Sequence, residues 1–231
     1  MSGFSFRESR SSLISAALAL LLCCAFIASG GCKAAAVAVA KTVGESVDAK
    51  YVPKKDDPIL VVAENYQNPG ANALESEQLA RYVSRGLAKK KVAPLIDPTL
   101  VMDLRTKDPD AFRKMTITQI GEKLGAKQVL YISILVDGIQ DTTGAEFRRG
   151  EASALVKIVD VSTGETRWPG AAASGYPIAA KTPVTKVATD AEEAALKRAT
   201  QARLGGDIAR LFYKYKRDEE GDDAFGGGTS Y

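Results

Sequence analysis

The chain has 231 residues, with 31 basic and 28 acidic side chains, three cysteines and no histidine. The lack of histidine excludes serine–histidine and cysteine–histidine catalysis and every metal site that needs imidazole ligands. The charge is nearly balanced, and no aromatic residues stand among the short basic clusters, so we expect no nucleic-acid partner. These clusters could contact anionic lipid or glycan, but we interpret them as solvated helix ends and loops: Lys54-Lys55, Lys89-Lys90-Lys91 and Arg148-Arg149.

The first 31 residues have the pattern of a secretory signal peptide. Arg7 and Arg10 supply a weakly basic start, and residues 13–27 form an unbroken run of apolar and small residues. The small residues 28–31 then lead directly into Cys32. A basic start, an apolar region and small residues at the end are typical of an export signal that is cleaved.

The position of cleavage decides which cysteines remain. Cleavage before Cys32 removes Cys23 and Cys24 with the signal, so no disulfide can form within the mature chain. With one cysteine and no histidine, we expect neither a cofactor nor a metal site. Two alternatives stay open. The signal could be cut at an A-x-A-like site within residues 36–40, or remain as a helix, although its apolar run is shorter than the roughly 20 residues that span a bilayer.

The first half of the chain alternates predicted strands and helices. Continuous apolar runs predict buried strands, and apolar residues at helical spacing predict a long helix that starts with acidic residues and ends with lysines. The predicted elements are strands over residues 59–63 and 92–96, a helix over 74–90 and two short helices within 98–115.

The second half contains the strongest predicted strand, over residues 129–136, which is apolar on both faces and therefore favours a central position in a sheet. Two capping boxes, Thr116-x-x-Gln119 and Thr189-x-x-Glu192, predict helix starts. Between these helix starts lie a polar loop over 138–150, a strand over 152–161, a tight turn over 162–165 and a strand beginning near Thr166. The last helix is predicted to run to Tyr215, with Gly205-Gly206 as a weak point.

This order of elements predicts one α/β domain, a layered structure of about five strands with helices packed on the sheet. The predicted organisation is a signal over residues 1–31, a lipidated N-terminus and flexible tether over 32–57, the domain over 58–215 and a disordered acidic and glycine-rich tail over 216–231. The domain length allows folding to bury about 68–70% of the unfolded chain's surface, enough for a self-sufficient core.

The N-terminal segment resembles a bacterial lipoprotein signal with its lipobox. The resemblance implies that the Cys32 thiol receives a diacylglyceryl group, that the peptide is cut before it and that the new amine is acylated. Several acyl chains on one residue would hold the protein stably on a membrane. Lys33, directly after the cysteine, resembles the sorting signal for the outer membrane, which implies an anchored protein that faces the periplasm.

A second resemblance lies within the predicted domain. The segments Gly125–Leu130 and Ala154–Glu165, the latter ending in D-x-x-T-G-E, are similar to the anticodon-binding-like domain of several envelope lipoproteins. Those lipoproteins include the curli secretion lipoprotein, the outer-membrane activators of penicillin-binding proteins and the TolB N-terminal domain. The resemblance implies a non-enzymatic binding or assembly module that activates a cell-wall synthase or assists a transport complex. Its partner is therefore expected to be one of these envelope proteins or a second copy of the chain.

The candidate partner contacts are Trp168 and Tyr176, or an exposed edge of the sheet. Trp168 has an alternative role in packing, and Asp160 and Gly164 are interpreted as turn residues rather than metal ligands. No motif indicates a small-molecule substrate. An oligomeric secretion component that resembles the curli pore and an envelope hydrolase are the two alternative functions. The pore would need further pairs of long strands, and the hydrolase would need a converging pair of carboxylates or a Ser–Lys pair.

Overall fold

The computed structural model describes residues 45–217, apart from residues 69–70, 143, 145 and 171–173. Cys32, the first half of the predicted tether and residues 218–231 of the predicted tail therefore lie outside the described residues. Within residues 45–217, no helix is both long enough and apolar enough to cross a membrane.

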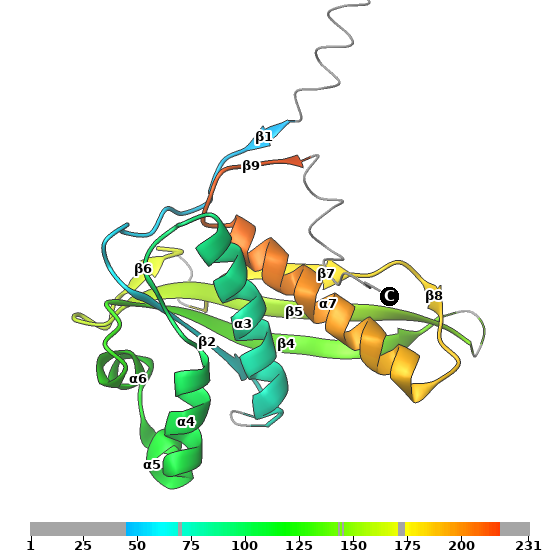
Figure 1. The fold of residues 1–231 in the computed structure, drawn as a ribbon, viewed down its shortest axis with the longest axis horizontal. Coiled ribbons are helices and arrows are strands. Elements are labelled where there is room, and N and C mark those ends of the chain that lie inside the picture. The colour runs from blue at the N-terminus through cyan, green and yellow to red at the C-terminus, as the bar shows by residue number, and fades with distance from the viewer. Residues whose placement is uncertain (1–44, 69–70, 143, 145, 171–173, 218–231) are drawn as a thin grey trace, which may run out of the picture. The chain divides into compact units, whose positions relative to one another are not determined.

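The main sheet has seven strands, and five of them follow the order β3-β2-β4-β5-β6 (Figure 1). β2 runs parallel to both β3 and β4, whereas β4 and β5 form a long antiparallel hairpin. β7 and β8 also pair with β5, beside β6. The strands are β2 (Ile59–Asn65), β3 (Leu95–Ile96), β4 (Gln128–Asp141), β5 (Phe147–Asp160), β6 (Thr166–Trp168), β7 (Tyr176–Lys181) and β8 (Thr185–Lys186).

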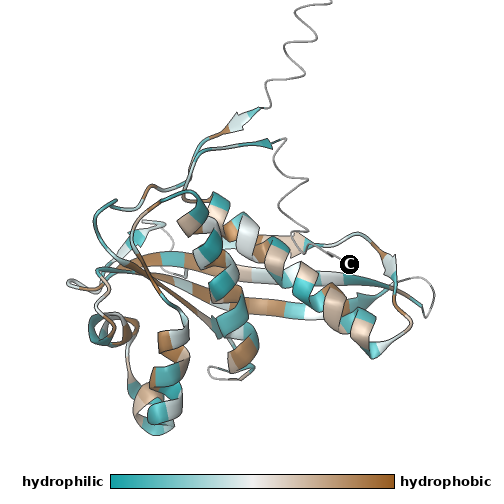
Figure 2. Ribbon diagram, viewed as in Figure 1, coloured by the Kyte–Doolittle hydropathy of each residue, from teal (hydrophilic) through white to brown (hydrophobic). Residues whose placement is uncertain are grey.

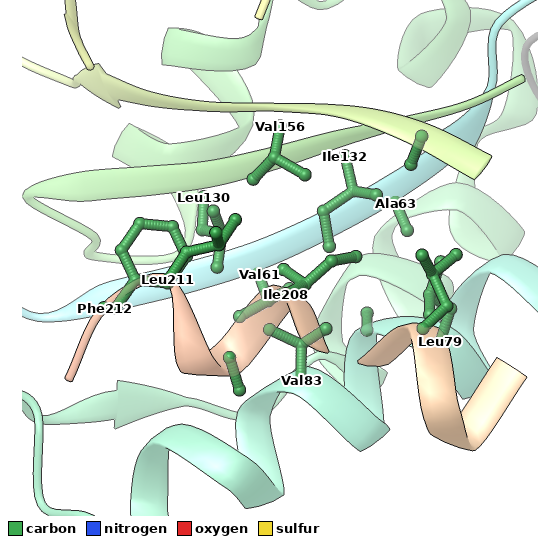
Figure 3. Packing of buried hydrophobic residues seen from close by; sticks show 14 of the residues in the cluster. Val61, Ala63, Leu79, Val83, Leu130, Ile132, Val156, Ile208, Leu211 and Phe212 are labelled. Carbon is green, nitrogen blue, oxygen red and sulfur yellow. The ribbon is translucent and has the colours of Figure 1, made fainter. Parts of the chain in front are cut away.

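Two long helices, α3 (Ala73–Lys89) and α7 (Asp190–Arg210), lie side by side across one face of this sheet (Figure 1). Figure 3 shows Val83 of α3 and Ile208 of α7 packed beneath side chains of the central strands, among them Val61 and Leu130. In Figure 2 the central strands are largely brown, whereas the helices carry hydrophilic residues between their apolar ones. This face holds the larger part of the hydrophobic core.

Three short helices, α4 (Thr99–Lys107), α5 (Pro109–Lys114) and α6 (Ile117–Lys123), pack on the opposite face. Their buried residues form a second core with residues of β2 and β4: Leu60, Val62, Val101, Phe112, Ile120, Ala126 and Val129. The predicted α/β class, with helices packed on a central sheet, is confirmed. Both predicted capping boxes are present, at Thr116 and at Thr189.

Several predicted boundaries were wrong. The segment 138–150, predicted as a polar loop, is mostly strand because β4 and β5 continue to Asp141 and from Phe147. The last helix ends at Arg210, and β9 (Tyr215–Lys216) pairs instead with β1 (Ser46–Val47). Residues of the segment assigned to the tether contact the domain: the backbone N–H groups of Lys50 and Tyr51 both donate to the Leu211 carbonyl, at 2.8 and 3.1 Å.

Candidate interaction surface

The described residues contain no group of three or more aspartate, glutamate or cysteine side chains that could hold a metal ion. The long hairpin instead presents a sheet face on the side opposite α3 and α7. The helices α4 to α6 pack against β2 and the first residues of β4, so the later part of that face is the place to look for a contact. We call this part the open sheet face and define it by Tyr131, Ser133, Leu135, Val136, Ser153, Leu155 and Lys157.

Strand register explains why these residues share a face. Tyr131 lies opposite Lys157 and Ser133 lies opposite Leu155 in the antiparallel ladder between β4 and β5. The register then shifts between Ile134 and Val136, so one extra residue stands in β4 at Leu135. Such a bulge changes which side chains point to each side of the sheet.

The bulge gives the open sheet face an apolar centre. Val136, which now lies opposite Ser153, is 40% exposed, and Leu135 is 37% exposed. Tyr66 lies beside them, since its backbone N–H donates to the carbonyl of Ile134 at 2.9 Å, and its side chain is also exposed. Three large apolar side chains therefore stand in solvent at the end of β2 and the middle of β4.

A charged cluster borders this apolar centre. Arg105 donates to Glu64 at 2.8 Å, and the Tyr131 hydroxyl donates to the same carboxylate at 3.3 Å. Burial, followed by the nearby Glu64 charge, raises the pKa of Tyr131 to about 12, so its hydroxyl stays protonated near neutral pH. The Lys157 ammonium lies 5.5 Å from the centre of the Tyr131 ring and the Arg105 guanidinium 4.7 Å from that of Phe112.

The surface therefore combines exposed apolar side chains with a border of charged groups that hydrogen bonds and ring contacts keep in place. This is the arrangement of a protein-binding surface, in which an apolar centre is surrounded by polar residues. The cluster lacks the pair of nucleophile and base that covalent catalysis needs, because its carboxylate is paired with an arginine and its hydroxyl is a weak acid.

The two predicted contact residues, Trp168 and Tyr176, lie together in an aromatic cluster. Their rings stack at 5.1 Å, Tyr51 stacks on Trp168 at 6.2 Å and Phe212 meets the indole edge-on at 5.5 Å. Trp168 is only 9% exposed, so most of its surface is used in packing within the domain. A partner contact at this place remains a prediction, and it would have to use Tyr176 and the rings around it.

A groove of about 310 Å³ extends from Tyr176 along the edge of β7. Its walls come from Ile178 and Ala179 of β7, the end of α7, and the paired segments of β1 and β9. Among the described residues β7 pairs with β5 alone, so its other edge is an edge of the sheet, which is the kind of place predicted for a partner contact. Pro177 fits this position because proline has no N–H to donate to a further strand.

The open sheet face was not predicted from the sequence. The run Ile134-Leu135-Val136 was interpreted as fully buried because a continuous apolar run gives no sign of a bulge. A usable signal was the polar residue Asp137 directly after this run, which breaks the apolar pattern at the place where the register shifts. Cys32, the predicted lipidation site, lies outside the described residues.

The model of a family described as peptidoglycan-synthase activator LpoB matches residues 33–173, more than half of the chain. This range includes every residue of the open sheet face and ends before β7. No curated protein matches the sequence.

Three solved structures are similar in fold, at low identity. Lipoprotein GNA1162 from Neisseria meningitidis is 15% identical over 61% of this chain and 92% of that chain, with a TM-score of 0.43. The PelC dodecamer from Paraburkholderia phytofirmans is 12% identical over 72% and 93%, with a TM-score of 0.36. The LpoB C-terminal domain from Salmonella enterica is 17% identical over 58% and 85%, with a TM-score of 0.32.

Proposed function

Because the chain belongs to the peptidoglycan-synthase activator LpoB family, we propose that it is an outer-membrane lipoprotein that binds and activates a peptidoglycan synthase. The family match over residues 33–173 carries this proposal. In this role the protein performs no chemistry itself. It shifts the synthase towards its active conformation by binding that conformation more tightly than the inactive one.

We further propose that the synthase binds at the open sheet face. Leu135 and Val136 would be the anchors, because exposed apolar side chains at the centre of a contact lose the most water on binding. Lys157 and the Arg105–Glu64 pair would fix the orientation at the border. The whole surface lies within the part of the chain that matches the family.

The double variant Leu135→Asp/Val136→Asp tests this contact. We expect it to bind the synthase of the same cell at least about 30-fold more weakly, since anchor residues contribute about 2 kcal/mol or more. Stimulation of glycan polymerisation should fall in parallel. Both side chains are already exposed, so the fold should persist, which circular dichroism can check.

The matched control is Val52→Asp/Val184→Asp, which places the same charges at two other exposed valines. It should bind the synthase as the wild type does. Full binding by the Leu135/Val136 variant would overturn the proposed surface. Loss of binding in Tyr176→Ser alone would move the contact to the aromatic cluster and the β7 groove.

The anchor is proposed at Cys32, with cleavage before it and the organisation given above: signal 1–31, tether, periplasmic domain and tail. Mass spectrometry of the mature N-terminus should find a diacylglyceryl group on Cys32 and an acyl chain on its amine. The Cys32→Ser variant should be released from membranes by high salt, whereas the lipidated wild type should stay bound. An unmodified N-terminal residue in the native protein would contradict lipid anchoring while leaving synthase binding untouched.

A further inference from the structure

A dense group of basic residues lies at the end of the domain where α3 and α7 finish. In Figure 1 the C-terminal ends of both helices lie beside β1 and β9. We call this region the basic end and define it by residues 45–50, 89–91 and 207–217. These segments carry eight basic residues and three acidic ones. The basic residues are Lys50, Lys89, Lys90, Lys91, Arg210, Lys214, Lys216 and Arg217.

Contacts between side chains and backbone groups hold these segments together. The Lys90 ammonium lies 5.6 Å from the centre of the Tyr213 ring, which connects the end of α3 to the chain after α7. Tyr213 meets Tyr215 at 6.4 Å, and Arg210 lies over Tyr215 at 5.4 Å. The Lys50 backbone N–H donates to the Leu211 carbonyl at 2.8 Å. Three distant sequence segments that carry lysines therefore meet at this end of the domain.

The acidic residues at this end neutralise only part of the charge. Asp48 pairs with Lys214 at 2.8 Å, and Asp207 pairs with Arg210 at 3.0 Å. The lysines at positions 89 to 91 and at position 216 are all exposed. An excess of positive charge of this density attracts an anionic surface, and the attraction acts within about a Debye length of it.

Chain connectivity identifies the anionic surface. Ser46, the first residue of β1, lies 14 positions after Cys32, so an extended connection reaches at most about 50 Å. A lipid on Cys32 would therefore keep the domain near a bilayer, and the chain would enter the domain at the basic end. We infer that the basic end docks on anionic phospholipid headgroups and so orients the domain on the membrane. This inference rests on the proposed lipid anchor.

The orientation has a consequence for the proposed function. Docking through residues 89–91 and 214–217 holds the domain by the ends of α3 and α7, and the open sheet face belongs to the opposite face of the sheet. Leu135 and Val136 would then stay accessible to the synthase while the domain lies on the bilayer. Lipid binding and synthase binding are expected to be compatible in one molecule.

Cosedimentation with phospholipid vesicles tests the inference with a chain of residues 33–231, which carries no lipid of its own. It should bind vesicles that contain phosphatidylglycerol and not vesicles of pure phosphatidylcholine, and binding should weaken as salt is raised. The variant Lys89→Gln/Lys90→Gln/Lys91→Gln should bind about 100-fold more weakly, since each lysine near an anionic surface contributes about 1 kcal/mol.

The matched control is Lys107→Gln/Lys114→Gln/Lys123→Gln, which removes the same charge from exposed positions on α4, α5 and α6. It should bind vesicles as the parent chain does. A chain that ends at Arg217 should bind more tightly, because residues 218–223 include five acidic side chains that follow the basic end directly. Weaker binding by that shorter chain would contradict the inference.

Equal binding to neutral and anionic vesicles, or equal loss in the two triple variants, would overturn the inference. Binding to isolated peptidoglycan but not to vesicles would assign the basic end to an anionic wall polymer. That result would also overturn the inference that it docks on phospholipid. The vesicle assay contains no synthase and needs no modification at Cys32. Its failure can therefore be told apart from a failure of the proposed activation or of the proposed anchor.

Discussion

Asp160 shows how one buried carboxylate fixes a turn. Its side chain accepts hydrogen bonds from the Ser162 N–H at 2.8 Å, the Ser162 hydroxyl at 2.6 Å and the Thr163 N–H at 3.2 Å. It also pairs with Arg167 in the middle of β6. Gly164 completes the turn with a φ of +75°, which glycine adopts without strain. The predicted role of Asp160 and Gly164 as turn residues is confirmed.

The Asp160 side chain should therefore contribute to the free energy of unfolding in two ways, through the hydrogen bonds it accepts and through its ion pair. Asp160→Asn keeps an acceptor for the backbone N–H groups but loses the ion pair with Arg167. Asp160→Ala loses both and should lower the free energy of unfolding by about 2–4 kcal/mol. Denaturant unfolding measures the difference, with the exposed Glu165→Gln as the control. Equal stability of the two Asp160 variants would show that the hydrogen bonds accepted by this side chain contribute nothing beyond the ion pair.

Asp137 is a half-buried carboxylate whose charge is poorly compensated. Its Oδ2 accepts from the Gln201 amide at 2.6 Å, but its Oδ1 has no hydrogen-bond partner among the described residues. Burial raises the pKa of Asp137, and the Glu75 charge adds to this, although the Gln201 hydrogen bond and Lys197 act in the opposite direction. Ionisation of Asp137 is therefore less favourable in the folded protein than in the unfolded chain.

Asp137→Asn should raise the unfolding midpoint at neutral pH, because it removes a charge that folding desolvates. A carboxyl whose pKa is raised on folding destabilises the fold when ionised, and protonation relieves this cost. The advantage of the variant should thus shrink as the pH falls through the raised pKa of Asp137. Thermal unfolding across a pH series measures it, with the exposed Asp103→Asn as the reference. A variant that is less stable at neutral pH would contradict this account.

At the scale of elements, the close contact between α3 and α7 depends on glycine. A Cβ atom on Gly205 would lie 2.5 Å from the Tyr82 Cβ, and one on Gly86 would lie 2.7 Å from the Ala209 Cβ. A Cβ on Gly206 would meet nothing within 4 Å. The Gly205-Gly206 pair, predicted as a weak point of the helix, therefore includes one residue that lets the two helices approach.

Alanine at the two positions should have opposite effects. Gly205→Ala should lower the free energy of unfolding by about 1–3 kcal/mol, because the added methyl group pushes α3 away. Gly206→Ala should raise it by about 0.5–1 kcal/mol, since alanine is the better helix former and the space is open. Guanidinium unfolding measures the free energies of unfolding of both variants against that of the wild type. If helix propensity alone decided the outcome, both variants would be more stable than the wild type.

Elements with local signals could be predicted from the sequence, and those that depend on distant partners could not. The capping boxes at Thr116 and Thr189 involve residues within one turn, and both helix starts were predicted correctly. β7 and β8 were missed because each is short and exists through pairing with β5. The open sheet face was missed for a similar reason, since the bulge at Leu135 is a property of the pairing with β5.

At the scale of the whole domain, residues 46–57 bind the N-terminal part of the domain to its C-terminal part. Besides the bonds of Lys50 and Tyr51 to Leu211, the fully buried Gln128 amide donates to the Lys54 and Asp57 carbonyls at 3.3 and 3.4 Å. Tyr51 also covers Trp168. This segment therefore closes the aromatic cluster and satisfies a polar group at the start of β4.

A chain that starts at Pro58 should be less stable than one that starts at Ser46. Removing residues 46–57 leaves the buried Gln128 amide without its partners, at a cost of about 1–3 kcal/mol, and removes an aromatic pair of about 0.5–1.5 kcal/mol. The free energy of unfolding, measured with urea, should therefore fall by about 2–4 kcal/mol. Tryptophan fluorescence should show that Trp168 is more exposed to solvent. The variant Tyr51→Ala in the longer chain should show the fluorescence change with a smaller loss of stability. Equal stability of the two chains would mean that the domain is complete from Pro58, as the sequence analysis expected.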